Sequence, residues 1–179
     1  MVEPQYKEFT KIDLSDFSWV HFEGRVSNLK CVRAMMDLVL SLPGKRPTIS
    51  VEIEKPREGV EQFFRGADFV FIGKDFAKWK GINDMISTIK IAAEKWASSN
   101  STLICAWAEK GACARKVSGE IITVSACVPQ KVIDTLGDTF VAACIHGLSK
   151  GDALEGALKF GCEVAGKKCG QKGLLNILQ

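Results

Sequence analysis

Several kinds of segment are missing from the sequence, and each absence narrows the class of protein. No apolar run approaches the roughly 20 residues that a bilayer-spanning helix needs. The polar stretch from Met1 to Tyr6 contains no signal-peptide core. Only two histidines are present, and no Cys-x-x-Cys pair occurs. A membrane protein, a secreted protein and a zinc site are therefore disfavoured, and we expect a cytoplasmic location with no membrane partner.

The charge and the composition set further limits. The 179-residue chain carries a net charge of +3, with 25% charged and 46% hydrophobic residues. A charge this small gives no reason to expect nucleic acid as a partner. The hydrophobic share is that of an ordinary globular protein, and the length suits one domain with its own core. We therefore predict a single domain over residues 1–179.

The seven cysteines do not form a disulfide pattern. Their number is odd, and most lie within apolar stretches such as Thr102 to Trp107. Thiols in such stretches are usually free and buried, as is common in a reducing compartment. Neither His21 nor His146 has a spacing to these cysteines that suits a metal site. We predict free cysteines, and no metal held by protein ligands alone.

The hydrophobic pattern alternates between strands and helices. Strands are predicted over residues 19–23, 48–54, 69–72, 101–107 and 120–125. Helices are predicted from the cap Ser27 to about residue 42, over 58–64 and 83–98, from 139 to a break at 149–151, and over 152–168. Strands separated by helices imply crossover connections, and hence an α/β fold with a mostly parallel sheet flanked by helices.

Two loops have chemistry that suits the ligand-binding edge of such a sheet. Ligands bind beyond the carboxyl ends of the strands, where loops enter the following helices. The first loop, residues 108–111, directly follows the strand that ends at Trp107. Its glycine permits the backbone to approach a ligand closely, and an ordinary tight turn is the competing interpretation.

The second loop, residues 132–140, leads into a helix and places Asp138 directly after Gly137. A glycine turn at a helix N-terminus presents unpaired N–H groups and the positive end of the helix dipole, and both favour an anion. An N-cap role for Asp138 is the competing interpretation, because aspartate is a preferred residue at that position.

The second loop also carries a resemblance. Residues 134–140 read Asp-Thr-Leu-Gly-Asp-Thr-Phe. This sequence is similar to the C-terminal signature of the ribokinase-like (PfkB) sugar kinases, in which the order is Asp-Thr-x-Gly-Ala-Gly-Asp-Thr-Phe. Further similarity is to the ketohexokinase (hepatic fructokinase) branch of that family. Stretches of that branch are resembled, in the same order along the chain, by residues 19–25, 51–58, 105–109 and 160–170. The resemblance implies a ribokinase-like fold and ATP-dependent transfer of a phosphoryl group to the C1 hydroxyl of fructose or a related ketose.

The resemblance also implies roles for individual residues. Asp138 corresponds to the catalytic base that faces the sugar, and Gly137 to part of the anion hole for the transferred phosphoryl group. Asp134 and Thr135 correspond to the region that orders phosphate and cation. The nucleotide is expected to contact Ala108, Glu109, Lys110, Gly111, Gly137 and Asp138. Mg²⁺ is expected to arrive with the ATP, without a protein cage of its own.

Two departures from the family pattern bear on activity. No Ala-Gly pair separates Gly137 from Asp138, so the motif is two residues short. Two residues span about 7 Å of extended chain, and each lost anion-hole donor costs about 10²–10³ in rate at comparable sites. The strands, the lid and most sugar contacts that precede Trp19 in the family have no counterpart, so the usual lid-mediated homodimer is not expected. A catalytically deficient nucleotide-binding or partner-binding fragment is the alternative function.

One further motif is interpreted as structural. Residues 161–167 match the Gly-x-x-x-x-Gly-Lys part of a Walker A phosphate loop. The next residue is Lys168 instead of Ser or Thr, and the stretch continues a helical pattern instead of following a strand. We therefore predict a helix whose small residues Gly161, Ala165 and Gly166 permit close packing.

Overall fold

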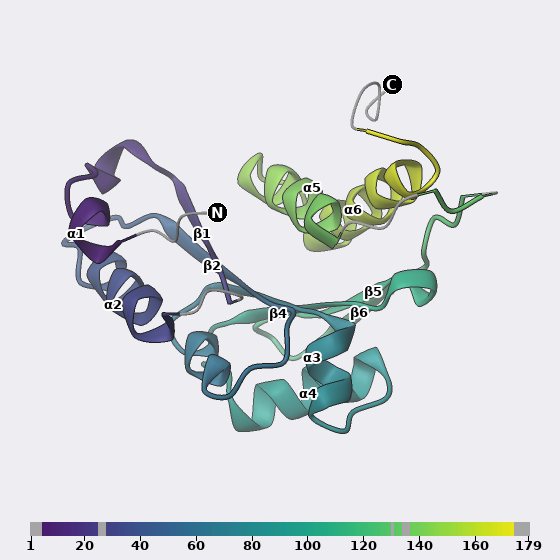
Figure 1. Ribbon diagram of the computed structural model, residues 1–179, viewed down its shortest axis with the longest axis horizontal. Coiled ribbons are helices and arrows are strands. Elements are labelled where there is room, and N and C mark those ends of the chain that lie inside the picture. The colour runs from purple at the N-terminus through teal and green to yellow at the C-terminus, as the bar shows by residue number, and fades with distance from the viewer. Residues whose placement is uncertain (1–4, 25–27, 130, 134–136, 174–179) are drawn as a thin grey trace.

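A computed structural model describes residues 5–24, 28–129, 131–133 and 137–173 of the chain (Figure 1). The strands are β1 (Trp19–Glu23), β2 (Thr48–Ile53), β3 (Phe69–Ile72), β4 (Thr102–Ala106), β5 (Ala112–Arg115) and β6 (Ile121–Val124). The α-helices are α1 (Tyr6–Phe9), α2 (Leu29–Leu40), α3 (Lys74–Trp79), α4 (Met85–Lys95), α5 (Gly137–Ser149) and α6 (Leu154–Cys169). Short 3-10 helices are η1 (Leu14–Asp16), η2 (Val60–Phe64) and η3 (Ala108–Lys110).

The six strands form one sheet, in the order in which they follow one another along the chain. Strands β1 to β4 are parallel to their neighbours, whereas β5 and β6 are antiparallel. Parallel strands laid down in sequence, with crossovers of one hand, place their connecting helices on one face of the sheet. The predicted α/β fold with a mostly parallel sheet is therefore confirmed.

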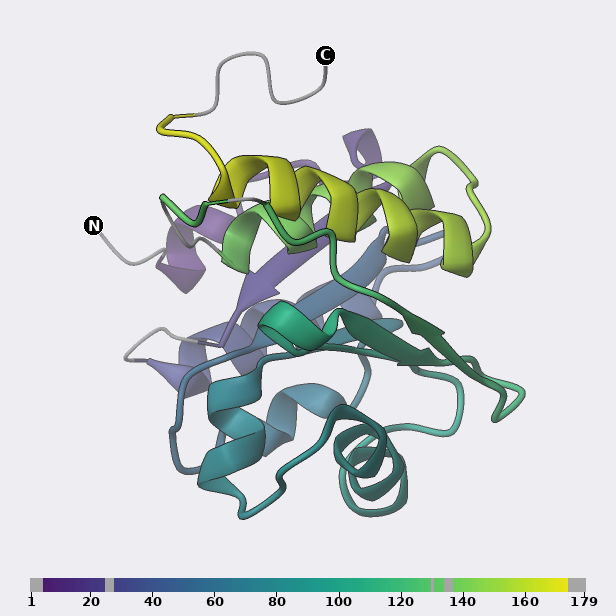
Figure 2. The same ribbon diagram turned by 90° about the vertical axis from the view of Figure 1, so that its right-hand side faces the viewer.

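The two faces of the sheet are covered differently. One face, which we call the first face, is buried under α2, η2, α3 and α4, and its core includes Met36, Val51, Phe64, Val70 and Ile89. The opposite, second face is covered by α5 and α6, which pack side by side over the β4–β6 end (Figures 1 and 2). Over β1 and β2 the second face has no helix among the described residues.

Helix ends follow ordinary capping chemistry, with one correction to the sequence analysis. The N-cap of α2 is Asn28, whose side chain accepts a hydrogen bond from the N–H of Cys31 at 3.0 Å, so the expected cap at Ser27 is wrong by one residue. Asp84 caps α4 in the same way, with 2.8 Å from its Oδ1 to the N–H of Ser87. The predicted helix over 83–98 is confirmed, with bounds shorter at both ends.

The connection after β4 differs from the prediction. No strand was predicted between residues 107 and 120, but residues 108–111 turn the chain back into β5, which pairs with β4 in antiparallel register. The reason is the sequence of β5 itself, Ala-Cys-Ala-Arg, which carries no β-branched or aromatic residue and so gives little strand signal. The short helices α1 and α3 were missed because a helix of four or six residues shows no full period.

The Walker-like stretch lies within α6, as predicted. A Cβ on Gly161 would lie 2.5 Å from Sγ of Cys144 on α5, and a Cβ on Gly166 would lie 2.0 Å from the carbonyl oxygen of Cys127. Both distances are shorter than real Cβ contacts, so these glycines permit a packing that alanine would prevent. The interpretation of the stretch as a closely packed helix is confirmed.

All seven cysteines are free, as predicted. Four of them, Cys105, Cys113, Cys144 and Cys162, are buried, whereas Cys127 is exposed, so the expectation of burial is wrong for that residue. No helix in the described part of the chain is long and apolar enough to span a membrane.

Candidate functional site

A cavity of about 610 Å³ lies between the second face of the sheet and the helices α5 and α6. Its walls are supplied by the residues that follow three parallel strands, by the segment between β6 and α5, and by one face of α6. These wall residues include Glu54, Lys55, Lys74, Asp75, Ala108, Glu109, Gly111, Cys127, Gly137, Phe140 and Gly166. The carboxyl edge of a parallel sheet is where α/β proteins bind ligands, so the cavity is the candidate site.

The cavity brings together four of the eight residues that the sequence analysis selected. Ala108, Glu109, Gly111 and Gly137 line it, although the first three are separated from Gly137 by more than 20 residues of sequence. Lys110 and Asp138 do not line the cavity, and both are exposed. Asp134 and Thr135, the predicted phosphate and cation region, lie outside the described residues.

The turn between β4 and β5 is tightly constrained. Ala108 has a φ of +45°, the one positive φ of a non-glycine residue in the described part of the chain, and Gly111 has a φ of +89°. The N–H of Trp107 donates to the carbonyl oxygen of Gly111 at 2.7 Å. A Cβ on Gly111 would lie 2.0 Å from the carbonyl oxygen of Val124. The close approach that this glycine permits is therefore to the backbone of β6, and it fixes the turn that forms the cavity wall.

The N-terminus of α5 closes the opposite side of the cavity. The helix is held in place by Phe140 and Val141, which are buried against the second face of the sheet. A Cβ on Gly137 would lie 4.0 Å from Oε1 of Glu54, so the helix begins beside the residue that follows β2. The first N–H groups of a helix have no acceptor within the helix itself, and this makes the N-terminal end of α5 suitable for an anion.

Asp138 lies on the first turn of α5, on the side of the helix toward β1. Its negative charge acts on His21 of β1 and favours the protonated ring, as does the charge of Glu23. Burial of the ring is the larger effect, so the pKa of His21 is lowered from its ordinary value. Asp138 and His21 are therefore near enough for their charges to interact.

His21 is held on the second face of the sheet by a hydrogen bond and a ring contact. Its Nδ1 lies 2.8 Å from Oγ of Ser50, and the same oxygen accepts a hydrogen bond from Nε1 of Trp19 at 2.8 Å. The His21 ring packs edge-on against Phe71, with 6.1 Å between ring centroids. Side chains of β1, β2 and β3 are thus linked to one another on the second face of the sheet.

Charged side chains form the rim of the cavity. Nζ of Lys55 lies 2.9 Å from Oε1 of Glu54 and 3.4 Å from Oδ2 of Asp75. The hydrogen bond to Glu54 is the main reason that the pKa of Lys55 is raised. Nζ of Lys74 lies 3.1 Å from Oε1 of Glu109. The pKa of Glu109 is lowered, first by a hydrogen bond from its own backbone N–H and then by Lys74.

The rim was not among the sequence-selected residues. Glu54, Lys55, Lys74 and Asp75 all lie within three residues of the end of a parallel strand, and that position is the signal that would have identified them. The lining contains four carboxylates, those of Glu52, Glu54, Asp75 and Glu109, and two lysines, which leaves a net charge of −2. Among the described residues, no group of three or more His, Cys, Asp or Glu side chains is arranged to hold a metal ion.

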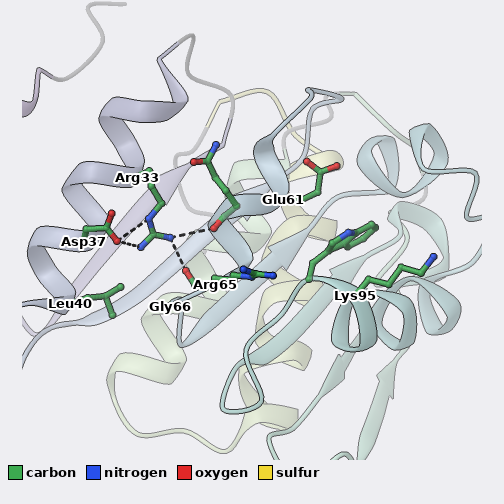
Figure 3. Close-up of a pocket in the computed structure, with 9 residues that line it drawn as sticks. Arg33, Asp37, Leu40, Glu61, Arg65, Gly66 and Lys95 are labelled. Atoms are coloured by element: carbon green, nitrogen blue, oxygen red, sulfur yellow. Dashed lines mark hydrogen bonds and ion pairs between the residues drawn. The ribbon is translucent and has the colours of Figure 1, made fainter.

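A second cavity, of about 590 Å³, opens between α2, η2 and the end of α4 (Figure 3). Arg33 extends from α2 across it, and Figure 3 shows its guanidinium group bonded to Asp37 and to two backbone carbonyl oxygens. These carbonyls belong to Gln62 and Arg65, at 3.2 and 2.8 Å. The cavity lies at the amino end of β3, the edge opposite to the ligand-binding edge. Arg33 there ties α2 to the segment that enters β3, which is a structural role.

Comparisons with known proteins agree with this geometry. The sequence profile described as pfkB family carbohydrate kinase matches residues 14–179. Mouse (Mus musculus) ketohexokinase is 41% identical to the chain over 179 residues, an alignment that covers 96% of the chain and 59% of the mouse protein. The chain therefore spans less than two thirds of the length of this relative.

Solved structures show the same fold at low sequence identity. A probable sugar kinase from Rhizobium etli superposes with a TM-score of 0.76 at 20% identity, covering 93% of the chain and 53% of that protein. Ribokinase from Cryptococcus neoformans, solved in complex with ADP, gives a TM-score of 0.73 at 18% identity, covering 93% and 58%. Fold and profile agree over nearly the whole sequence, and the chain belongs to the pfkB family of carbohydrate kinases.

Proposed function

We propose that the cavity binds ATP and that the chain is a ketose kinase, which transfers the terminal phosphoryl group of ATP to the C1 hydroxyl of fructose or a related ketose. The observation that carries the proposal is that residues 108–111 and the N-terminus of α5 meet on one cavity. Its volume of about 610 Å³ lies in the range of sites for cofactor-sized ligands. The similarity to mouse ketohexokinase supports the choice of a ketose.

The charge of the cavity supports the magnesium complex of ATP as the bound form. The lining carries a net charge of −2, and a bare triphosphate would add further negative charge at short range. A divalent cation on the phosphates removes most of this repulsion and needs no protein cage. We expect ATP to bind at least tenfold more weakly in excess chelator than with Mg²⁺, as measured by isothermal titration calorimetry.

Asp138 is the proposed base toward the sugar hydroxyl. Its exposed carboxylate lies on the first turn of α5, directly after Gly137 of the cavity lining, and its charge acts on His21 of β1. In this proposal the sugar lies over β1 and β2. In the proposed reaction the C1 hydroxyl gives its proton to Asp138 as the bond from oxygen to the γ-phosphorus forms. The bond between the γ-phosphorus and the bridging oxygen breaks, and ADP leaves with Mg²⁺. The N–H groups at the start of α5, with Gly137 first, would stabilise the charge on the transferred group.

The shortened motif leads us to expect slow transfer. Relative to the family signature, two residues are missing between Gly137 and Asp138, and with them two potential N–H donors of the anion hole. The same observation favours a second candidate function, which is nucleotide binding without transfer.

A purified chain decides between these functions. We expect calorimetry to detect MgATP binding and a coupled assay to detect fructose-dependent ADP release. Asp138→Asn should lower kcat by at least about 10²-fold and leave the affinity for MgATP unchanged, because it removes a general base. Asp16→Asn, an exposed carboxylate of η1, is the matched control. Equal rates for the two variants would refute the base role of Asp138.

Two other results would change the assignment. MgATP binding without fructose-dependent ADP release would favour the second candidate. Absence of MgATP binding to a cooperatively folded chain would refute both.

A further inference from the structure

Three thiols lie on the wall of the cavity, and the proposed phosphoryl transfer requires none of them. Cys162 and Cys169 belong to α6, and Cys127 belongs to the segment between β6 and α5 that runs along that helix. Cys127 is exposed, whereas Cys162 is only 7% exposed. Their accessibility differs although they share one cavity.

Cys127 and Cys162 are brought together by Gly166. A Cβ on Gly166 would lie 2.8 Å from Cβ of Cys127, so this segment contacts the helix directly. Cys162 lies four residues earlier on the same face of α6, and such positions are about 6 Å apart between Cβ atoms. The Cβ atoms of the two cysteines are therefore within about 9 Å of each other.

The charge of Cys127 also affects the pKa of Cys162. Burial raises the pKa of Cys162 to about 11, and negative charge on Cys127 is the next contribution. Cys162 therefore forms little thiolate near neutral pH, whereas Cys127 is open to solvent. The accessible thiol reacts first with a reagent, and the buried thiol reacts second.

We propose that Cys127 is a site of thiol modification, and that it forms a disulfide with Cys162 that closes the cavity. The Cys127 thiolate attacks one sulfur of a small disulfide, such as oxidised glutathione, which forms a mixed disulfide and releases one glutathione thiol. Cys162 loses its proton to solvent and attacks the Cys127 sulfur, and the second glutathione thiolate leaves and is protonated by solvent. Two protein thiols and one small disulfide thus become one protein disulfide and two small thiols.

Bond formation requires movement of the cavity wall. A disulfide brings its Cβ atoms to about 4 Å, so the segment that carries Cys127 must shift along α6 toward Cys162. Ala126, Val128 and Pro129, in the same segment, line the cavity and would move with it. The shift narrows the cavity, so oxidation should weaken nucleotide binding. This consequence rests on the proposed function, whereas the disulfide itself does not.

Peptide mapping tests the thiol pair. After incubation of the native chain with oxidised glutathione, we expect the intact mass to fall by two hydrogens. Trypsin places Cys127 in the peptide 117–131, Cys162 in 160–167 and Cys169 in 169–172, so each possible crosslink has a different mass. A crosslink between 117–131 and 160–167 supports the proposal. A crosslink to 169–172, or a chain that ends as a mixed disulfide at Cys127, would overturn it.

Variants and affinity test the consequence. Cys162→Ser should stop at the mixed disulfide, whereas Cys169→Ser should crosslink like the unchanged chain. Oxidation should weaken MgATP binding at least tenfold, a loss that dithiothreitol reverses and that Cys127→Ser does not show. Unchanged affinity in the crosslinked chain would refute closure of the cavity. If the reduced chain does not bind MgATP, the proposed function fails, and the peptide map still decides the thiol pair.

Discussion

Replacement of Gly111 with alanine tests the turn that forms one wall of the cavity. The residue combines a φ of +89° with a Cβ position 2.0 Å from the carbonyl oxygen of Val124 and 2.7 Å from the N of Ala126. Alanine therefore meets two separate obstacles. The first is a backbone conformation that L residues rarely adopt, and the second is an overlap with the β6 backbone that no change of rotamer relieves.

The magnitude follows from these two costs. A left-handed conformation costs a non-glycine residue about 1–2 kcal/mol. Forcing an extra carbon into a packed region costs about 1–3 kcal/mol. We expect Gly111→Ala to lower the free energy of unfolding by about 3 kcal/mol. For a chain of this size that corresponds to a fall in Tm of about 6–12 °C.

Three other glycines separate the two costs. Gly151 has a φ of +91° with nothing within 4 Å of its Cβ position, so it isolates the backbone cost. Gly166 is helical and its Cβ position lies 2.0 Å from the Cys127 carbonyl oxygen, so it isolates the overlap. Gly156 is helical with nothing within 4 Å, and its replacement should stabilise the chain by about 0.5–1 kcal/mol.

Thermal unfolding followed by circular dichroism measures all four alanine variants, with MgATP titration as a second measurement. We expect Gly111→Ala to be the least stable, Gly151→Ala and Gly166→Ala to be intermediate, and Gly156→Ala to be at least as stable as the unchanged chain. A Tm for Gly111→Ala equal to that of Gly151→Ala would refute the reasoning, because it would show that contact with β6 adds no cost.

Two further predictions concern His21 and Arg33. The pKa of His21 is lowered in the folded chain, so below about pH 6.5 the unfolded chain binds more protons at this residue. The free energy of unfolding should therefore fall as the pH is lowered from that value. His21→Gln should make the free energy of unfolding depend less on pH, as measured by urea unfolding between pH 7.5 and 5.5. Arg33→Ala should lower the free energy of unfolding by about 2 kcal/mol in the same assay, because it removes hydrogen bonds from a charged group to the carbonyls of Gln62 and Arg65. As a control, Lys159→Ala breaks the exposed ion pair with Glu155 and should change the free energy of unfolding by less than about 0.5 kcal/mol.

Local sequence predicted the elements that carry a strong pattern. The strands β1 to β4 are apolar runs bounded by turn residues, and α2, α4 and α6 show a helical period, so their existence followed from the sequence. The strand β5 did not follow, because its small residues carry no strand signal. Its place is decided by Gly111, which contacts β6 some 13 residues later, and such a contact is invisible to local pattern.

In the candidate site, too, some features could be predicted from local sequence and others could not. The loop at 108–111 and the N-terminus of α5 were predicted because each follows a strand or begins a helix with suitable chemistry. The ion pair between Lys74 and Glu109 was not, because its residues are 35 apart in sequence and meet only when β3 and β4 are paired. Cys127 was expected to be buried, but it is exposed, and it lies against Gly166, a contact between residues 39 apart in sequence that local pattern cannot show.

The position of the cavity is a consequence of strand order. Because β1 to β4 follow one another across the sheet, their crossover helices all fall on the first face, and the second face is left to α5 and α6. Those two helices pack over β4 to β6, so they cover only one end of that face (Figure 2). The part of the second face over β1 and β2 is left uncovered by these helices, and there the charge of Asp138 acts on His21. If Asp138 is the base proposed above, the sugar lies over β1 and β2, and the larger side chain of His21→Trp should raise the KM for fructose before it weakens MgATP binding measured by calorimetry.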